Sequence, residues 1–123
     1  MSSGFQGLKV YELAYKLAME NFHLSKAFPK EETYSLTDQI RRSSHSICTN
    51  IAEGYRKRKY PKHFSSKMTD ADGECSETMV WLSFSKDCGY ITEKVCMNLF
   101  TQYEVVGKML GGMADHPEIF SPK

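Results

Sequence analysis

The chain has 123 residues, of which 25% are charged and 41% are apolar, and its formal net charge is +1. This length and composition are typical of one globular domain, and they exclude attraction to polyanions by overall charge alone. No apolar run approaches the roughly 20 residues that span a bilayer, and the segment MSSGFQG has no signal-peptide pattern. We therefore expect a cytoplasmic protein.

The first predicted helix covers residues 8–27 and carries an unusually wide apolar face. Two adjacent rows follow helical spacing, one through Leu8, Tyr11, Tyr15, Ala18 and Phe22 and one through Val10, Leu13, Leu17 and Leu24. One bundle core needs only a single stripe. The surplus indicates a second contact, with another copy of the chain. Phe28-Pro29 ends this helix, because proline disfavours helical geometry at the preceding residue.

Three further helices are predicted over residues 35–55, 61–88 and 92–113. The second has the apolar line Leu36, Ile40, Ile47 and Ile51, with small Ser43 and Ser44 between them. The third begins at Pro61, a favoured first-turn residue, and its apolar residues are Phe64, Met68, Ala71, Cys75, Met79 and Leu82, with a second row of Trp81, Phe84 and Cys88.

Gly89 predicts the stop of the third helix and Thr92 the cap of the fourth. The fourth helix has the apolar line Cys96, Leu99, Tyr103, Val106, Leu110 and Met113, and we expect it to fray at Gly111-Gly112. No segment alternates with a period of two residues. The sequence therefore predicts an all-α fold, an antiparallel up-down four-helix bundle in one domain, residues 1–123.

No catalytic, metal or cofactor site is indicated by the sequence. Cys48, Cys75, Cys88 and Cys96 form no CxxC pair and are expected to act as small buried hydrophobes. The run Ser43–Ser46 lacks the G-x-S-x-G turn that exposes a nucleophile. Bundles that bind two metal ions carry an E-x-x-H pair on each of two helices, whereas this sequence has one such pair, Glu20 to His23, and it has no glycine-rich phosphate loop. We expect no enzyme activity, no metal and no cofactor.

A structural polar network is predicted between the second and third helices. Asp70, Glu74 and Glu77 lie on one face of the third helix with no base among them, so they repel unless a cation faces them. A hairpin register centred near Lys59 places Arg42 level with Glu77 and Arg41 level with Thr78. We expect Arg41 or Arg42 to bind this stripe. The alternative is that both faces are solvated.

Gly54, in NIAEGY, has two interpretations. It either admits close approach of another helix or caps the second helix, since a glycine within a helix costs about 1 kcal/mol relative to alanine. Asn50 and Glu53 share a face with Arg42 and are expected to extend its network rather than to form a ligand site.

The cations that follow the second predicted helix form a cluster that is expected to face a ligand. The rings of Tyr55, Tyr60 and Phe64 are interleaved with five cations that lie within seven residues, with no acid among them: Arg56, Lys57, Arg58, Lys59 and Lys62. Flexible cations beside aromatic rings suit phosphate contact and base stacking without sequence readout. The alternative is a solvated turn that only keeps the protein soluble.

The ordered motifs LKVYELAYKL, FPKEETYSL, QIRRS and SICTNIAEGY resemble the bacterial four-helix-bundle family known as ribosomal-RNA intervening-sequence proteins, and Gly73, Glu77, Gly89 and Tyr90 match its second half. The resemblance covers about residues 8 to 113. It implies a left-handed bundle that forms a homo-oligomer, commonly a pentamer. Its relatives include retroelement accessory proteins that bind RNA or DNA and a reverse transcriptase, which makes such an enzyme the expected protein partner.

Two functions remain open at this point. The first is a non-catalytic, oligomeric nucleic-acid-binding or ribonucleoprotein accessory protein. The second is an oligomeric protein-interaction scaffold that binds no nucleic acid. Binding of RNA or DNA at the basic cluster distinguishes them.

Overall fold

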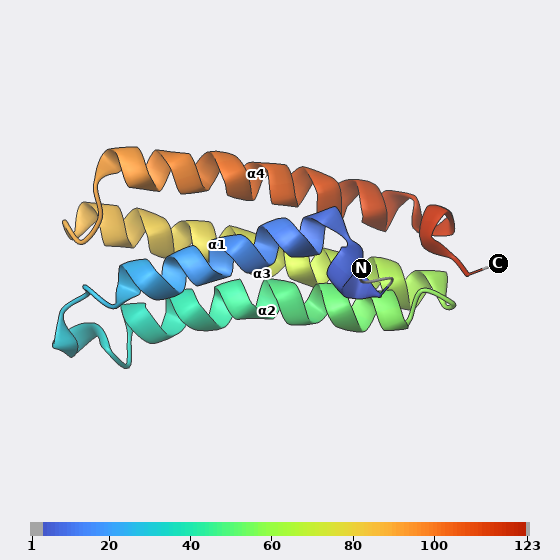
Figure 1. Cartoon of the computed structure of the whole chain (residues 1–123), viewed down its shortest axis with the longest axis horizontal. Helices are drawn as coiled ribbons and strands as arrows, with labels where there is room; N and C mark the ends of the chain where they lie inside the picture. The colour runs from blue at the N-terminus through green and yellow to red at the C-terminus, as the bar shows by residue number, and fades with distance from the viewer. Residues whose placement is uncertain (1–3, 123) are drawn as a thin grey trace.

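The computed structural model describes residues 4–122 and consists of four long helices arranged side by side (Figure 1). These are α1 (Lys9–Ser25), α2 (Leu36–Arg56), α3 (Pro61–Asp87) and α4 (Glu93–Asp115). Three short 3₁₀ helices, η1 (Phe5–Gly7), η2 (Lys30–Glu32) and η3 (Pro117–Phe120), accompany them, and residues 4–122 contain no strand. Each long helix packs against two neighbours, in the cyclic order α1, α2, α3, α4. The predicted all-α, up-down four-helix bundle is confirmed.

The helix ends have local causes. Pro61 occupies the first turn of α3, Gly89 adopts a positive φ of 81° just after that helix, and the Thr92 hydroxyl accepts a hydrogen bond of 3.1 Å from the Val95 backbone N–H. The expected fraying at Gly111-Gly112 is wrong, because α4 continues to Asp115. Tertiary contacts hold this last turn: Met113 is buried, and the Ser65 hydroxyl donates to the Ala114 carbonyl at 2.7 Å.

The core follows the predicted apolar lines in α2 and α4, all of whose named apolar residues are buried. In α1 the buried line runs between the two predicted rows, through Val10, Ala14, Leu17, Ala18 and Asn21. Of the second row predicted for α3, Trp81 is partly buried and packs against the core, but the other two residues do not. Phe84 and Cys88 are exposed because they lie on the outer side of the helix, although Cys48, Cys75 and Cys96 are buried as expected.

Gly54 is buried where α2 contacts α3. A Cβ at this position would lie 2.9 Å from Cβ of Lys67 and would also meet the Met68 methyl group. Of the two interpretations, close approach of another helix is therefore the one that holds. None of the helices in residues 4–122 is long and apolar enough to cross a membrane.

Candidate functional site

The predicted Arg42–Glu77 ion pair is absent from residues 4–122, and so is a pair between Arg41 and the acidic stripe. Arg41 instead contacts α1: its Nε donates to the Ser25 hydroxyl at 2.7 Å, and its guanidinium lies 4.8 Å from the centroid of the Phe22 ring. Arg42 is exposed. The sequence predicted the positions of these residues along the α2–α3 hairpin well. It did not predict their directions, because successive residues on a helix point about 100° apart. Arg41 therefore points toward α1, and Arg42 points outward.

The acidic stripe on α3 contacts α2 at one position. Burial, a hydrogen bond with the Glu77 carboxyl and the negative charges of Glu77 and Asp70 raise the pKa of Glu74. The Ser46 hydroxyl of α2 hydrogen-bonds to Glu74 and opposes this rise in pKa. A serine of α2 therefore contacts the stripe where the sequence led us to expect an arginine.

Asn50 and Glu53 are structural, but not through Arg42. Asn50 Nδ2 donates to the Ser46 carbonyl within α2 at 2.9 Å. The Glu53 carboxylate pairs at 2.9 Å with the ammonium group of Lys67 on α3, which lowers the pKa of Glu53 and raises that of Lys67. The expectation that these residues extend a network around Arg42 is wrong, since each has a nearer partner.

The cluster of cations lies at the turn between α2 and α3, at one end of the bundle together with η3 (Figure 1). We call residues 56–62 the basic turn. Arg56 is the last residue of α2, and Pro61 begins α3. Four cations of this turn are exposed, and no hydrogen bond or ion pair in the described part of the chain engages their side chains: Arg56, Lys57, Lys59 and Lys62.

Arg58 differs from the other four cations. Its guanidinium lies 4.0 Å from the centroid of the Tyr55 ring, and its Nη1 donates to the Tyr55 carbonyl at 2.9 Å. These two contacts hold the turn against the last residues of α2. Arg58 was grouped with the ligand-binding cations from the sequence, but the structure gives it a contact within the fold.

The turn also carries exposed rings. Tyr60 is 57% exposed, and the His63 ring lies 5.9 Å from it, centroid to centroid, at an interplanar angle of 45°. The Lys59 ammonium lies 5.9 Å from the Tyr60 ring centroid. Sequence reasoning did not pair His63 with Tyr60, and it counted Phe64, which is buried in the core, among the rings of the cluster. The position of His63 three residues after Tyr60, on the same side of the first turn of α3, was the available signal.

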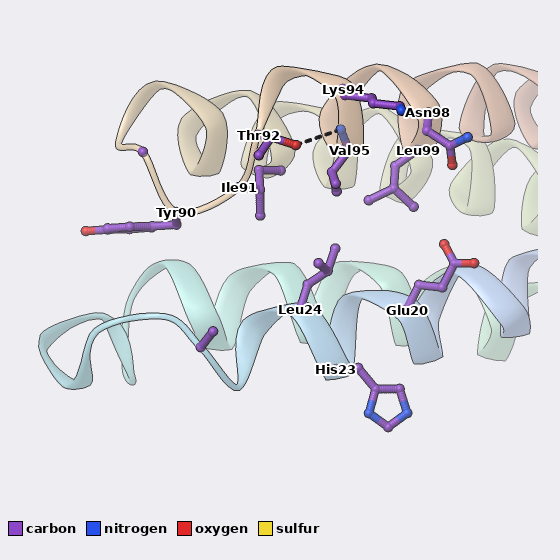
Figure 2. A pocket seen from close by; sticks show the side chains of 12 residues that line it. Glu20, His23, Leu24, Tyr90, Ile91, Thr92, Lys94, Val95, Asn98 and Leu99 are labelled. Carbon is purple, nitrogen blue, oxygen red and sulfur yellow. Dashed lines mark hydrogen bonds between the residues drawn. The ribbon is translucent and has the colours of Figure 1, made fainter.

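A groove of about 920 Å³ lies at the opposite end of the bundle, between the end of α1 and the start of α4. Figure 2 shows Leu24 of α1 directed toward Val95 and Leu99 of α4 and toward Ile91 in the turn before it, while the His23 ring points away from them. The facing surfaces are thus mainly apolar. The sequence did not reveal this groove, because it arises from the spacing of two helices that are distant in the chain.

The serine run of α2 forms packing contacts. Ser43 and Ser44 are buried, the Ser44 hydroxyl donates to the Ile40 carbonyl at 2.8 Å, and the Thr78 hydroxyl donates to Ser43 at 2.9 Å. These small polar side chains allow α2 and α3 to approach each other. Across residues 4–122, no group of three or more His, Cys, Asp or Glu side chains could hold a metal ion.

The family model described as "23S rRNA-intervening sequence protein" matches residues 6–112. The chain belongs to this family. Among solved structures, the bundle is similar to a protein of unknown function from the S23 ribosomal protein family of Bacteroides thetaiotaomicron, with 25% identity and a TM-score of 0.76. The alignment covers 85% of this chain and 97% of that one. A comparison with curated proteins gives no significant match.

Two motifs that carry the family resemblance meet at the end of the bundle away from the basic turn. The Tyr90 hydroxyl, from the Gly89-Tyr90 motif, donates to the Glu32 carboxylate of FPKEETYSL at 2.8 Å. This bond raises the pKa of Tyr90 to about 12. Hydrogen bonds from Ser35 and from Tyr90 lower the pKa of Glu32. These family residues therefore join the α1–α2 connection to the α3–α4 turn, which is a structural role.

Proposed function

We propose that this protein is a non-catalytic, oligomeric accessory protein of the cytoplasm that binds nucleic acid through its basic turn. The observation that carries the proposal is that four cations of the basic turn are exposed, with side chains that form no hydrogen bond or ion pair in residues 4–122. Arg56, Lys57, Lys59 and Lys62 are exposed at one end of the bundle, and their charge is not spent on hydrogen bonds or ion pairs within the described residues. Clustered exposed cations bind phosphates by releasing the counterions condensed on nucleic acid.

Two further observations support this proposal. The basic turn leads directly into α3, whose first backbone N–H groups carry partial positive charge and favour a phosphate. The matching family is described by a ribosomal RNA segment, the 23S rRNA intervening sequence, which makes RNA the first ligand to test. The four cysteines are not joined by disulfides, in keeping with a reducing compartment.

The oligomer is supported by two exposed apolar patches. The α1 patch contains Tyr15 and Met19, and the α3–α4 patch contains Val80, Phe84 and Met97. Because α1 and α3 lie diagonally across the bundle, the patches face different sides. When the α1 patch of one copy packs against the α3–α4 patch of the next, both patches are buried and successive copies form a ring. The family resemblance implies five copies in this ring.

We expect light scattering to give a mass that is a whole multiple of 14.1 kDa. Phe84→Glu should lower this mass, because it places a charge in the contact, whereas Tyr34→Glu, at a side chain that is 93% exposed, should not. A stable species of 14.1 kDa at micromolar concentration would contradict the oligomer.

Nucleic-acid binding is tested by replacing the four unengaged cations together with glutamine: Arg56, Lys57, Lys59 and Lys62. The matched control replaces four exposed lysines elsewhere, namely Lys16, Lys30, Lys94 and Lys108, so both variants have the same net charge. Fluorescence anisotropy follows labelled single-stranded and duplex RNA and DNA over a range of salt concentrations. We expect the basic-turn variant to lose most of its affinity, while the control variant keeps it.

The salt dependence gives the sharper measurement. Each phosphate contact contributes about 0.7 to the log–log salt slope on single strands and about 0.9 on duplexes. Removing four contacts should lower the slope by about 3. Equal binding by the two variants would place the site elsewhere on the surface. Undetectable binding by the wild type at low salt would favour the protein-interaction scaffold, for which the α3–α4 patch is the specific observation.

A further inference from the structure

Tyr55, which directly precedes the basic turn, and Tyr60, which lies within it, differ in accessibility. The Arg58 guanidinium covers one face of the Tyr55 ring at 4.0 Å and is fixed there by its hydrogen bond to the Tyr55 carbonyl. The Tyr60 ring is 57% exposed, and its cationic neighbour Lys59 lies farther away, at 5.9 Å. Tyr60 is therefore the ring of this turn that an incoming group can reach.

The surroundings of Tyr60 match those of a ring on which nucleobases stack. The imidazole of His63 supports the ring from the first turn of α3, at 5.9 Å between centroids. Lys59 precedes the ring and Lys62 follows it, and both side chains are exposed. An aromatic ring between mobile cations stacks a base while the cations contact the phosphates on either side of that base.

From this arrangement we propose that the basic turn binds unpaired nucleic acid, with one base stacked on the Tyr60 ring and the adjoining phosphates held by Lys59 and Lys62. This inference rests on the proposed function and names the ligand class of the same site. In a duplex, each base is already stacked between its neighbours, so the turn can contact only the phosphates. Single strands should therefore bind more tightly than duplexes at equal salt.

The test compares Tyr60→Ala with Tyr60→Phe, which keeps the ring, and with Tyr34→Ala, which removes an exposed tyrosine at the other end of the bundle. Labelled oligouridylate and oligothymidylate of about 12 nucleotides, duplexes of the same length and inorganic polyphosphate serve as probes. Polyphosphate carries the negative charge without bases. Circular dichroism melts establish that each variant is folded.

Tyr60→Ala should weaken single-strand binding about tenfold, which corresponds to about 1.4 kcal/mol. Tyr60→Phe and Tyr34→Ala should bind as the wild type does. The salt slope of Tyr60→Ala should stay unchanged, because no phosphate contact is lost, and its binding of duplexes and polyphosphate should also stay unchanged. Comparison of oligouridylate with oligothymidylate shows whether the unpaired strand is RNA, DNA or either.

The results separate this inference from the function on which it rests. If the wild type binds duplexes and single strands equally and Tyr60→Ala binds both normally, base stacking is wrong while nucleic-acid binding stands. If Tyr60→Ala weakens polyphosphate binding as much as single-strand binding, Tyr60 acts by shaping the turn, and the inference is again overturned. If the wild type binds none of the probes at low salt, the proposed function and this inference both fail.

Discussion

Gly54→Ala should destabilise the protein by about 1–3 kcal/mol, the range expected for overpacking a well-packed contact. Alanine favours a helix over glycine by about 1 kcal/mol, so local propensity alone predicts the opposite sign. The tertiary contact decides the outcome. The added Cβ would lie 2.9 Å from Cβ of Lys67, a position fixed by the α3 backbone, and would meet the buried Met68 methyl group. The two helices would have to separate.

Gly73→Ala provides the matched control. Gly73 lies within α3 and is exposed, and apart from the local helix backbone no heavy atom lies within 4 Å of a Cβ built there. This variant should stabilise the protein by up to about 1 kcal/mol, because it gains helix propensity without a clash. Urea unfolding followed by circular dichroism measures both. A Gly54→Ala variant as stable as the wild type would show that α2 and α3 do not need their close approach.

The regular parts of this fold could be predicted from the sequence because one physical pattern controls them. In α4, the positions from Cys96 to Met113 repeat at helical spacing with one buried face, and all of the predicted apolar residues are buried. The register of the α2–α3 hairpin could also be predicted, since the contacts Glu53–Lys67 and Ser43–Thr78 lie near the expected levels. Both results depend only on helix rise and turn length.

The side-chain partners could not be predicted with the same success. Residues 41 and 42 are both arginine, and the direction that each one takes depends on the rotation of α2 about its own axis. That rotation is set by the whole core and not by the local sequence. The pair between Lys67 of α3 and Glu53 of α2 could likewise be recognised only once the faces of the two helices were known.

The two apolar rows predicted for α1 show a related limit. Small residues such as Ala14 and Ala18 lie at its most buried positions, whereas Tyr15 is exposed. Hydrophobic spacing gives more weight to large side chains, but close helix packing favours small ones at the contact. The basic turn could be located from composition alone. The separation of Arg58 from the other cations, and the pairing of His63 with Tyr60, required the folded geometry.

Asn21 is a polar core residue that the sequence did not indicate. It is fully buried on α1, where its Nδ2 donates to the hydroxyl of Tyr103 on α4 at 2.7 Å, and its Oδ1 has no hydrogen-bond partner within the described part of the chain. Burial raises the pKa of Tyr103, so its hydroxyl stays neutral at ordinary pH. The available signal was position: Asn21 follows Leu17 and Ala18 at the spacing of the buried stripe.

Tyr103→Phe should destabilise the protein by about 1–3 kcal/mol, because it leaves the buried amide of Asn21 without any partner. Tyr15→Phe is the matched control, since it removes an exposed hydroxyl and should change stability by less than about 0.5 kcal/mol.

The double variant Asn21→Leu with Tyr103→Phe replaces both polar groups by apolar ones of similar size. It should recover the stability of the wild type, because a polar pair replaced on both sides is close to neutral. Urea unfolding of the two single variants and the double variant gives the coupling energy. A neutral Tyr103→Phe would show that another group satisfies Asn21. A double variant less stable than Tyr103→Phe alone would show that Asn21 stabilises the bundle through contacts other than this bond.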